Sequence, residues 1–328
     1  MSDLSTRYMG LQLPSPFVVA SSSLSNKPEN FQSAEASGAG AIVLRSLFEE
    51  QIEAAETALE EAVSFQSNAN PEARSYMPPQ RIGPREYLRL LDKAKKSVRI
   101  PVIASLNAAA AGSWSEYAKQ LEDSGADGIE VNIYAVGADP DVTGEQIERE
   151  CIEIVRSVRK AVKIPIALKV SPFFTSFANV ARKFDAEGVN ALVLFNRFLQ
   201  PDIDLDRMAL HSSMQLSQPW EMLLPLRWTA ILHGRVKADL AASTGVHDTA
   251  GVVKMLLAGS TVVQLAACLI RNGVTHLSTL RTGLEGWMDR GHYSAVDDFR
   301  GTLSQKEARD PRAFERAQYV NLILSQNL

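Results

Sequence analysis

Short apolar segments recur along the chain, each after a helical pattern that ends in a glycine or an asparagine. The strands that follow this pattern are Ala41–Leu44, Ile129–Val131, Ala191–Leu194 and Thr261–Leu265. A further apolar run, Ile166–Val170, lies between two prolines and carries one lysine near its end. Continuous apolar runs of four or five residues are typical of strands buried on both faces of a parallel sheet. Glycine supplies the left-handed turn that ends many helices. The pattern therefore predicts alternating helices and strands, with helices covering the strands.

Eight such strands are predicted in one chain. They are expected at Phe17–Ala20, Ala41–Leu44, Val102–Ser105, Ile129–Asn132, Ile166–Val170, Ala191–Phe195, Lys237–Ala241 and Val262–Leu265. Helices are expected at Lys27–Ser37, Ser113–Ser124, Gly144–Val162, Phe174–Glu187, His247–Ala258 and Val274–Asp289. Eight strand–helix units favour a TIM (β/α)8 barrel over an open doubly wound sheet. We therefore predict an α/β protein in which residues 1–328 form a single barrel domain.

Two connections are longer than barrel loops usually are. The insertion after strand 2 runs from Phe48 to about Arg99 and includes an acidic helical segment, Glu49–Val63. The insertion after strand 6 runs from Arg197 to Arg235. Both leave the carboxyl end of a strand, where the active sites of barrel enzymes lie. We interpret these long insertions as a lid or substrate wall, with a decorative insertion as the alternative.

Composition narrows the class of protein further. The net charge of −4 gives no reason to expect a nucleic acid or an anionic membrane as partner. Two cysteines are too few for a disulfide framework, and Met1–Tyr8 lacks the apolar core of a signal peptide. No segment approaches the roughly 20 apolar residues of a membrane span. We expect a cytoplasmic protein without nucleic-acid or membrane partners.

Polar residues end six of the eight predicted strands. They are Ser21, Arg45 with Ser46, Ser105, Asn132, Lys169 and Asn196. Because a barrel gathers the carboxyl ends of its strands around one mouth, we expect these side chains to face one site. Solvation of the barrel rim is the simpler explanation for any one of them alone. No His, Cys, Asp or Glu cluster has the spacing of metal ligands, so no metal site is predicted.

Small residues follow the last two strands. Thr244 and Gly245 come after strand 7, and Ala266 and Ala267 come after strand 8. Small side chains let backbone N–H groups approach an anion, and a helix N-terminus adds a favourable dipole. These turns are candidates for a phosphate site, although ordinary tight-turn sterics explain them equally well.

Several motifs together resemble one family. They are Ser15–Ser21, Gly128–Asn132, Pro165–Val170 and Gln264–Ala266, with Gly291–Gly301 similar to the family's ending. On these residues the chain resembles, over nearly its full length, the dihydroorotate dehydrogenases, FMN-containing barrel enzymes of pyrimidine biosynthesis. The resemblance implies FMN at the mouth and a hydride passing between a substrate carbon and the flavin. It also implies a small-molecule substrate and a homodimer, and the N-terminal segment resembles that of the cytosolic branch.

The resemblance assigns roles to the strand-end residues. Lys169 is expected near the pyrimidine edge of the flavin, where its charge supports the reduced ring, and Asn132 is expected to act with it. Asn196 contacts flavin or substrate, and Ala20 and Ser21 line the ring. The other cofactor-binding residues expected are Arg45, Ser46, Ser105, Thr244, Gly245, Ala266 and Ala267.

The substrate half of the site departs from the family. The family has a proton-abstracting Cys or Ser three residues after the asparagine of strand 4, where this chain has Ala135. Alanine cannot accept a proton. Tyr134 is the nearest titratable replacement, although a phenol with a pKa of about 10 is a weak base and packing is the simpler role. Dihydroorotate is the substrate that the family implies, and the missing base points to a different one.

Two other functions remain open. A chain that has lost the base can be a non-catalytic flavin-binding or partner subunit. A lysine at a strand end can also be the nucleophile of a flavin-free Schiff-base barrel enzyme, with Lys169 in that role. Flavin bound to the purified protein would exclude the last of these.

Overall fold

The computed structural model describes residues 2–48, 83–108, 114–197, 200–211 and 215–325. Within them, eight parallel strands close into a barrel, and their order around the barrel is their order in the chain. These strands are β3 (Phe17–Val19), β4 (Ala41–Val43), β6 (Val102–Ala108), β7 (Gly128–Ile133), β8 (Ile166–Val170), β9 (Ala191–Leu194), β12 (Asp239–Ser243) and β13 (Val262–Leu265). The barrel closes where β13 pairs with β3, so the predicted TIM (β/α)8 barrel is confirmed.

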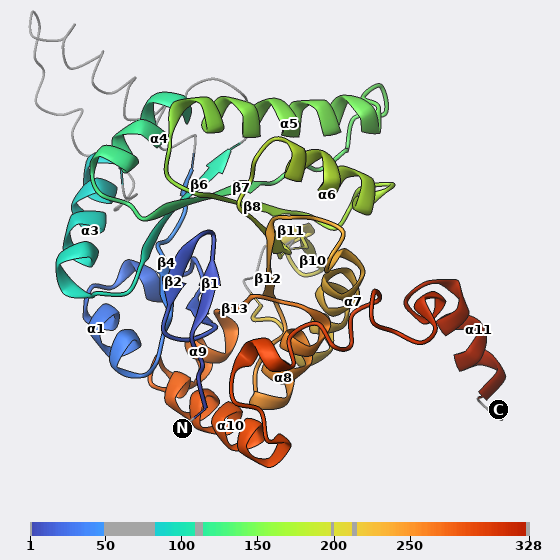
Figure 1. Ribbon diagram of the computed structural model, residues 1–328. Coiled ribbons are helices and arrows are strands. Elements are labelled where there is room, and N and C mark those ends of the chain that lie inside the picture. The colour runs from blue at the N-terminus through green and yellow to red at the C-terminus, as the bar shows by residue number, and fades with distance from the viewer. Residues whose placement is uncertain (1, 49–82, 109–113, 198–199, 212–214, 326–328) are drawn as a thin grey trace, which may run out of the picture.

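Helices cover the outer face of the barrel (Figure 1). They are α1 (Glu29–Ala36), α3 (Pro84–Ser97), α4 (Trp114–Asp123), α5 (Gly144–Ala161), α6 (Phe177–Ala186), α7 (Leu223–Leu232), α8 (Thr249–Ala258) and α10 (His276–Gly291). The six predicted helices are confirmed to within a few residues at their ends. Helices α3 and α7 were not predicted, because they lie inside the two connections that were interpreted as insertions. Each long connection therefore contains a barrel helix.

The remaining parts of these connections are only partly described. Residues 49–82, which include the predicted acidic helix Glu49–Val63, lie outside the described residues. After β9, the chain forms a hairpin of β10 (Asp202–Asp204) and β11 (Ala209–His211), then the short helix η4 (Pro219–Met222) before α7. The other short helices are η1 (Leu24–Asn26), α9 (Ala267–Asn272), η5 (Val296–Asp298) and η6 (Pro311–Phe314). Helix α11 (Arg316–Ser325) projects away from the barrel (Figure 1).

Apolar side chains pack on both faces of the barrel strands. Outward-facing residues such as Leu168 and Val131 pack with the helices in the larger core. A smaller cluster fills the inside of the barrel, and it includes Val18, Ala41, Val43, Ile103, Ala167, Ala191, Val193, Ala241 and Val262. Many of these inner residues are alanine or valine because an eight-stranded barrel leaves little room on its axis. The alternation along each strand decides which side chains reach the interior.

An antiparallel hairpin closes the amino-terminal end of the barrel. Strands β1 (Thr6–Tyr8) and β2 (Leu11–Leu13) form it, and it lies across that end in Figure 1. Tyr8 and Leu13 are fully buried and pack with the inner cluster. The backbone N–H of Met9 donates to Asp239 Oδ2 at 2.7 Å, which ties the turn to the start of β12. The polar residues that end the barrel strands therefore lie at the opposite, carboxyl-terminal end of the barrel.

Carboxylates on three helices bind the chain just before it enters a strand. Glu122 Oε1 accepts the backbone N–H groups of Lys163 and Ile164, at 2.7 and 3.0 Å. Glu35 does the same for Arg99 and Ile100, and Asp185 for Lys237 and Ala238. This last contact explains why strand 7 begins at Asp239 and not at the predicted Lys237. The amides of Lys237 and Ala238 bond to a side chain instead of a neighbouring strand.

Candidate active site at the barrel mouth

Lys169 lies on the inner face of β8, beside Asn132 of β7 in the strand register. Its side chain is buried, and its Nζ lies 3.6 Å from Glu130 Oε1 and 3.5 Å from Gln264 Oε1. Gln264 Nε2 in turn donates to Glu130 Oε2 at 2.6 Å. A cation, a carboxylate and an amide from three strands therefore form one polar group inside the barrel.

Hydrogen bonds connect four of the predicted strand-end residues. Ser46 Oγ lies 3.1 Å from Ser21 Oγ and 2.8 Å from Ser105 Oγ. Asn132 Nδ2 donates to Ser105 Oγ at 2.8 Å and to Ser46 Oγ at 3.1 Å. Asn196 Nδ2 donates to the backbone oxygen of Lys169 at 3.2 Å. The structure therefore brings these residues together around one mouth, as the sequence predicts.

The hydroxyl of Tyr87 supports this network from behind. Strand 2 is interrupted between β4 and β5 (Leu47–Phe48), and both parts pair with β6. At the gap, Ser105 N–H donates to Tyr87 Oη at 2.7 Å and Tyr87 Oη donates to Ser105 O at 3.1 Å. A side chain of α3 thus replaces the missing strand, and the interruption lets Ser46 join the network at the mouth.

Other predicted residues lie outside this network. Arg45 is exposed, and Tyr134 is exposed at the end of β7. Ala135, the position of the family's base, is half-buried. Ala20 is buried and its N–H donates to Leu265 O at 2.9 Å, which fixes the backbone at the end of β3.

The candidate phosphate turns have a packing explanation of their own. Thr244 and Gly245 both have positive φ, of 80° and 76°. A Cβ on Gly245 would lie 2.3 Å from the backbone nitrogen of Met222, so the close approach of η4 requires glycine there. The Gly245 N–H donates to Ser217 Oγ at 3.3 Å, and Asp248 caps α8. Ala266 and Ala267 are half-buried at the start of α9. Phosphate binding at these turns stays a prediction.

Three buried polar residues near Lys169 were not among the predicted site residues, and they are Glu130, Gln264 and Tyr8. Glu130 is fully buried, and its position two residues before Asn132 on one strand places both on the inner face. Burial raises the pKa of the Tyr8 phenol well above its ordinary value, and the nearby Glu130 and Asp239 raise it further. A charged residue at an inner position of a buried strand was the signal that could have identified Glu130.

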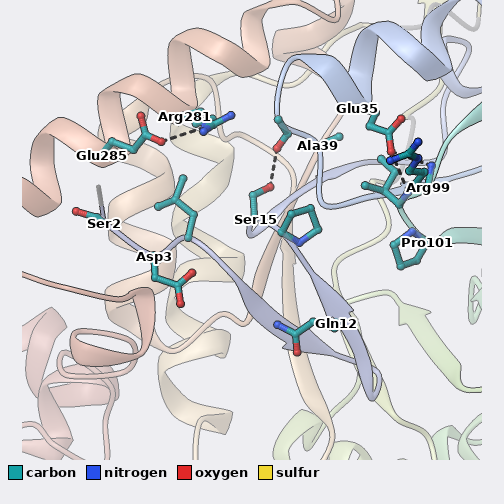
Figure 2. A pocket seen from close by; sticks show the side chains of 14 residues that line it. Ser2, Asp3, Gln12, Ser15, Glu35, Ala39, Arg99, Pro101, Arg281 and Glu285 are labelled. Carbon is teal, nitrogen blue, oxygen red and sulfur yellow. Dashed lines mark hydrogen bonds and ion pairs between the residues drawn. The ribbon is translucent and has the colours of Figure 1, made fainter.

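A cavity of about 600 Å³ lies at the amino-terminal side of the barrel, away from this site. Figure 2 shows its charged lining, with Arg281 paired to Glu285 and Glu35 turned to the segment at Arg99. Glu35 ties α1 to the segment before β6, and the Arg281–Glu285 pair lies within α10, so these charges have structural roles and we assign the cavity no function. In the described residues, no His, Cys, Asp or Glu side chains form a group of three or more that could hold a metal ion. None of the described helices is both long and apolar enough to cross a membrane.

Comparison with known proteins gives full-length relatives but no matching family model. The chain is 23% identical over 323 residues to the catalytic subunit of dihydroorotate dehydrogenase B (NAD(+)) of Thermoplasma volcanium, covering 93% of this chain and 100% of that protein. The same subunit of Methanothermobacter thermautotrophicus is 27% identical over 231 residues, 66% of this chain and 72% of that protein. A putative dihydroorotate dehydrogenase A (fumarate) of Aeropyrum pernix is 26% identical over 227 residues, 67% of this chain and 72% of that protein.

Proposed function

Because the chain is a divergent member of the dihydroorotate dehydrogenase family, we propose that it is an FMN-dependent oxidoreductase acting on a CH–CH bond of a small molecule. The observation that carries the proposal is the position of Lys169. It lies buried beside Asn132 on the inner face of the barrel, at the end where the strand termini form a polar network. The relatives' names support the reaction class, and the position of Lys169 supports the barrel mouth as the site that we propose.

The hydrogen-bonding groups at the mouth fit the polar edge of a flavin ring. Asn132 and Asn196 use their Nδ2 groups on protein acceptors, and no donor from the described residues occupies their Oδ1 atoms. Those oxygens are suited to accept from ligand N–H groups. Bound FMN would supply the hydride chemistry. The ammonium of Lys169 would act electrostatically, by offsetting negative charge that develops beside it.

Dihydroorotate is the first substrate to test, because the relatives are named for it. Ala135 offers no atom that accepts a proton, and it occupies the position at which the family has its base. We therefore expect slow turnover of dihydroorotate, and faster turnover of a substrate whose oxidation does not depend on a base at this position.

The test is the visible spectrum of the purified protein. Bound FMN gives a yellow protein, and anaerobic addition of substrate bleaches the flavin absorbance. Lys169→Ala should weaken FMN binding or slow the bleaching. A protein that is colourless and takes up no added FMN would contradict the proposal.

A non-catalytic flavin-binding subunit is the second candidate, and Ala135 is the observation that favours it. In that case FMN is bound but no organic hydride donor reduces it at a useful rate. The Schiff-base alternative is disfavoured, because the Lys169 ammonium forms an ion pair with Glu130 and an ammonium is not a nucleophile. The homodimer and the cytoplasmic location stay predictions, which sedimentation and cell fractionation would test.

A further inference from the structure

We propose that Glu130 is a positioning residue that holds the Lys169 side chain in place inside the barrel. The flavin-related part of this inference rests on the proposed function, whereas the ion pair itself does not. The inference concerns a carboxylate to which the family resemblance gave no role.

The burial of Glu130 requires a compensating charge. Its side chain is fully buried, and a buried carboxylate without a partner is strongly destabilising. Oε2 accepts a hydrogen bond from Gln264, but Oε1 has no hydrogen-bond partner in the described part of the chain. The Lys169 ammonium at 3.6 Å from Oε1 is the cation with which Glu130 pairs. The two charges therefore depend on each other.

The strand register places the carboxylate one layer deeper than the lysine. Asn132 is the register partner of Lys169, and Glu130 is the partner of Ala167. The ammonium is therefore held from the closed side of the barrel by Glu130 and from β13 by Gln264 Oε1 at 3.5 Å. An ammonium has three N–H donors, and these two acceptors occupy at most two of them. One donor is left for a ligand at the mouth.

The other titratable groups near this pair do not replace either partner. Tyr8 of β1 stays a neutral phenol, because burial raises its pKa well above the ordinary value. Asp239 at the start of β12 is a second carboxylate, and it accepts the Met9 N–H. Neither residue supplies a positive charge to Glu130. Removal of the Glu130 carboxylate should therefore affect the Lys169 side chain directly.

The experiment uses the full-length protein stripped of FMN, with ¹⁵N-labelled lysine. NMR follows the Lys169 Nζ resonance at one fixed pH, and the Lys169→Met spectrum identifies that resonance. Glu130→Gln should shift and broaden the Lys169 Nζ resonance, because the side chain loses its buried partner, and Glu130→Asp should restore part of the difference. Glu148→Gln is the matched control, because Glu148 pairs with Lys183 at 2.8 Å on the surface. A Lys169 Nζ resonance that is unmoved in Glu130→Gln would overturn the inference.

Urea unfolding keeps the inference testable if a single variant folds poorly. The double variant Glu130→Gln with Lys169→Met removes both charges, so it should unfold at a higher urea concentration than either single variant. If the double variant were destabilised by the sum of the two single effects, the claim that Glu130 and Lys169 pair would be wrong. A colourless protein whose Lys169 responds to Glu130→Gln contradicts only the proposed function.

Discussion

The hydroxyl of Tyr87 is a single atom on which the geometry of the mouth depends. It takes the place of a neighbouring strand for Ser105, accepting its N–H at 2.7 Å and donating to its C=O at 3.1 Å. Tyr87→Phe removes that atom and changes almost nothing in volume. Ser105 is fully buried, so water cannot take over the two lost hydrogen bonds.

The expected cost follows from these contacts. Two neutral hydrogen bonds contribute about 0.5–1.5 kcal/mol each, and an unsatisfied buried donor costs about 1–3 kcal/mol. Allowing for overlap between these terms, Tyr87→Phe should lower the free energy of unfolding by about 2–4 kcal/mol. Ser46 and Asn132 both bond to Ser105 Oγ, so the same change should also weaken FMN binding.

Urea unfolding followed by circular dichroism measures the first effect, and FMN titration measures the second. Tyr117→Phe is the matched control, because the Tyr117 hydroxyl makes one hydrogen bond, to Pro84 O at 3.1 Å, at the start of the same helix. That variant should lose about 1 kcal/mol and keep its FMN affinity. If Tyr87→Phe were no less stable than Tyr117→Phe, the claim that a side chain replaces the strand would be wrong.

Three further predictions concern the glycine turns, the helix carboxylates that bind the chain before it enters a strand, and the barrel mouth. Gly245→Ala combines a positive φ with a contact too close for a Cβ, so it should destabilise by more than about 3 kcal/mol, whereas Gly125→Ala, at φ +87° with open space around it, should cost about 1 kcal/mol in thermal unfolding. The pKa of Glu122 is lowered from 4.5, mainly by the hydrogen bond from Lys119 and then by two backbone N–H groups. The ionised Glu122 therefore stabilises the fold above pH 4.5, and this stabilisation is lost as the pH falls through the lowered pKa. Glu122→Gln should therefore be less stable than the wild type at pH 7, and unfolding curves should converge in acid. Asn132→Leu should weaken FMN binding at least tenfold by fluorescence titration, and an unchanged affinity would remove Asn132 from the site.

The sequence predicted the barrel well because its strands are buried on both faces. Ile166–Val170 and Val262–Leu265 were placed at their observed ends, since an uninterrupted apolar run has few alternative positions. Helix α3 was missed because a long polar segment precedes it in the same connection. Its apolar residues Tyr87, Leu91 and Ala94 do follow helical spacing, so the signal was present.

The site was predictable only in part, for a different reason. Strand-end side chains share one mouth by the topology of a barrel, so grouping Ser46, Ser105 and Asn132 needed no knowledge of distances. The pairing of Glu130 with Lys169 depends on which faces of two strands turn inward and on their register. The gap that Tyr87 fills depends on an interruption in a strand that no apolar pattern marks. Contacts of this kind join segments far apart in the chain.

In the part of the chain that the structure describes, the β1–β2 hairpin covers the amino-terminal end of the barrel. Tyr8, Met9 and Leu13 are almost fully buried at that end and pack with the inner cluster. Among the described residues, the mouth is therefore the end left for a ligand of Lys169, and we expect reactants to arrive and depart by that route. For the proposed oxidoreductase, the molecule that gives up a hydride must leave before a second molecule of similar size can take its place. The kinetics should then alternate between two half-reactions, in an order imposed by the end of the barrel that takes no part in the chemistry.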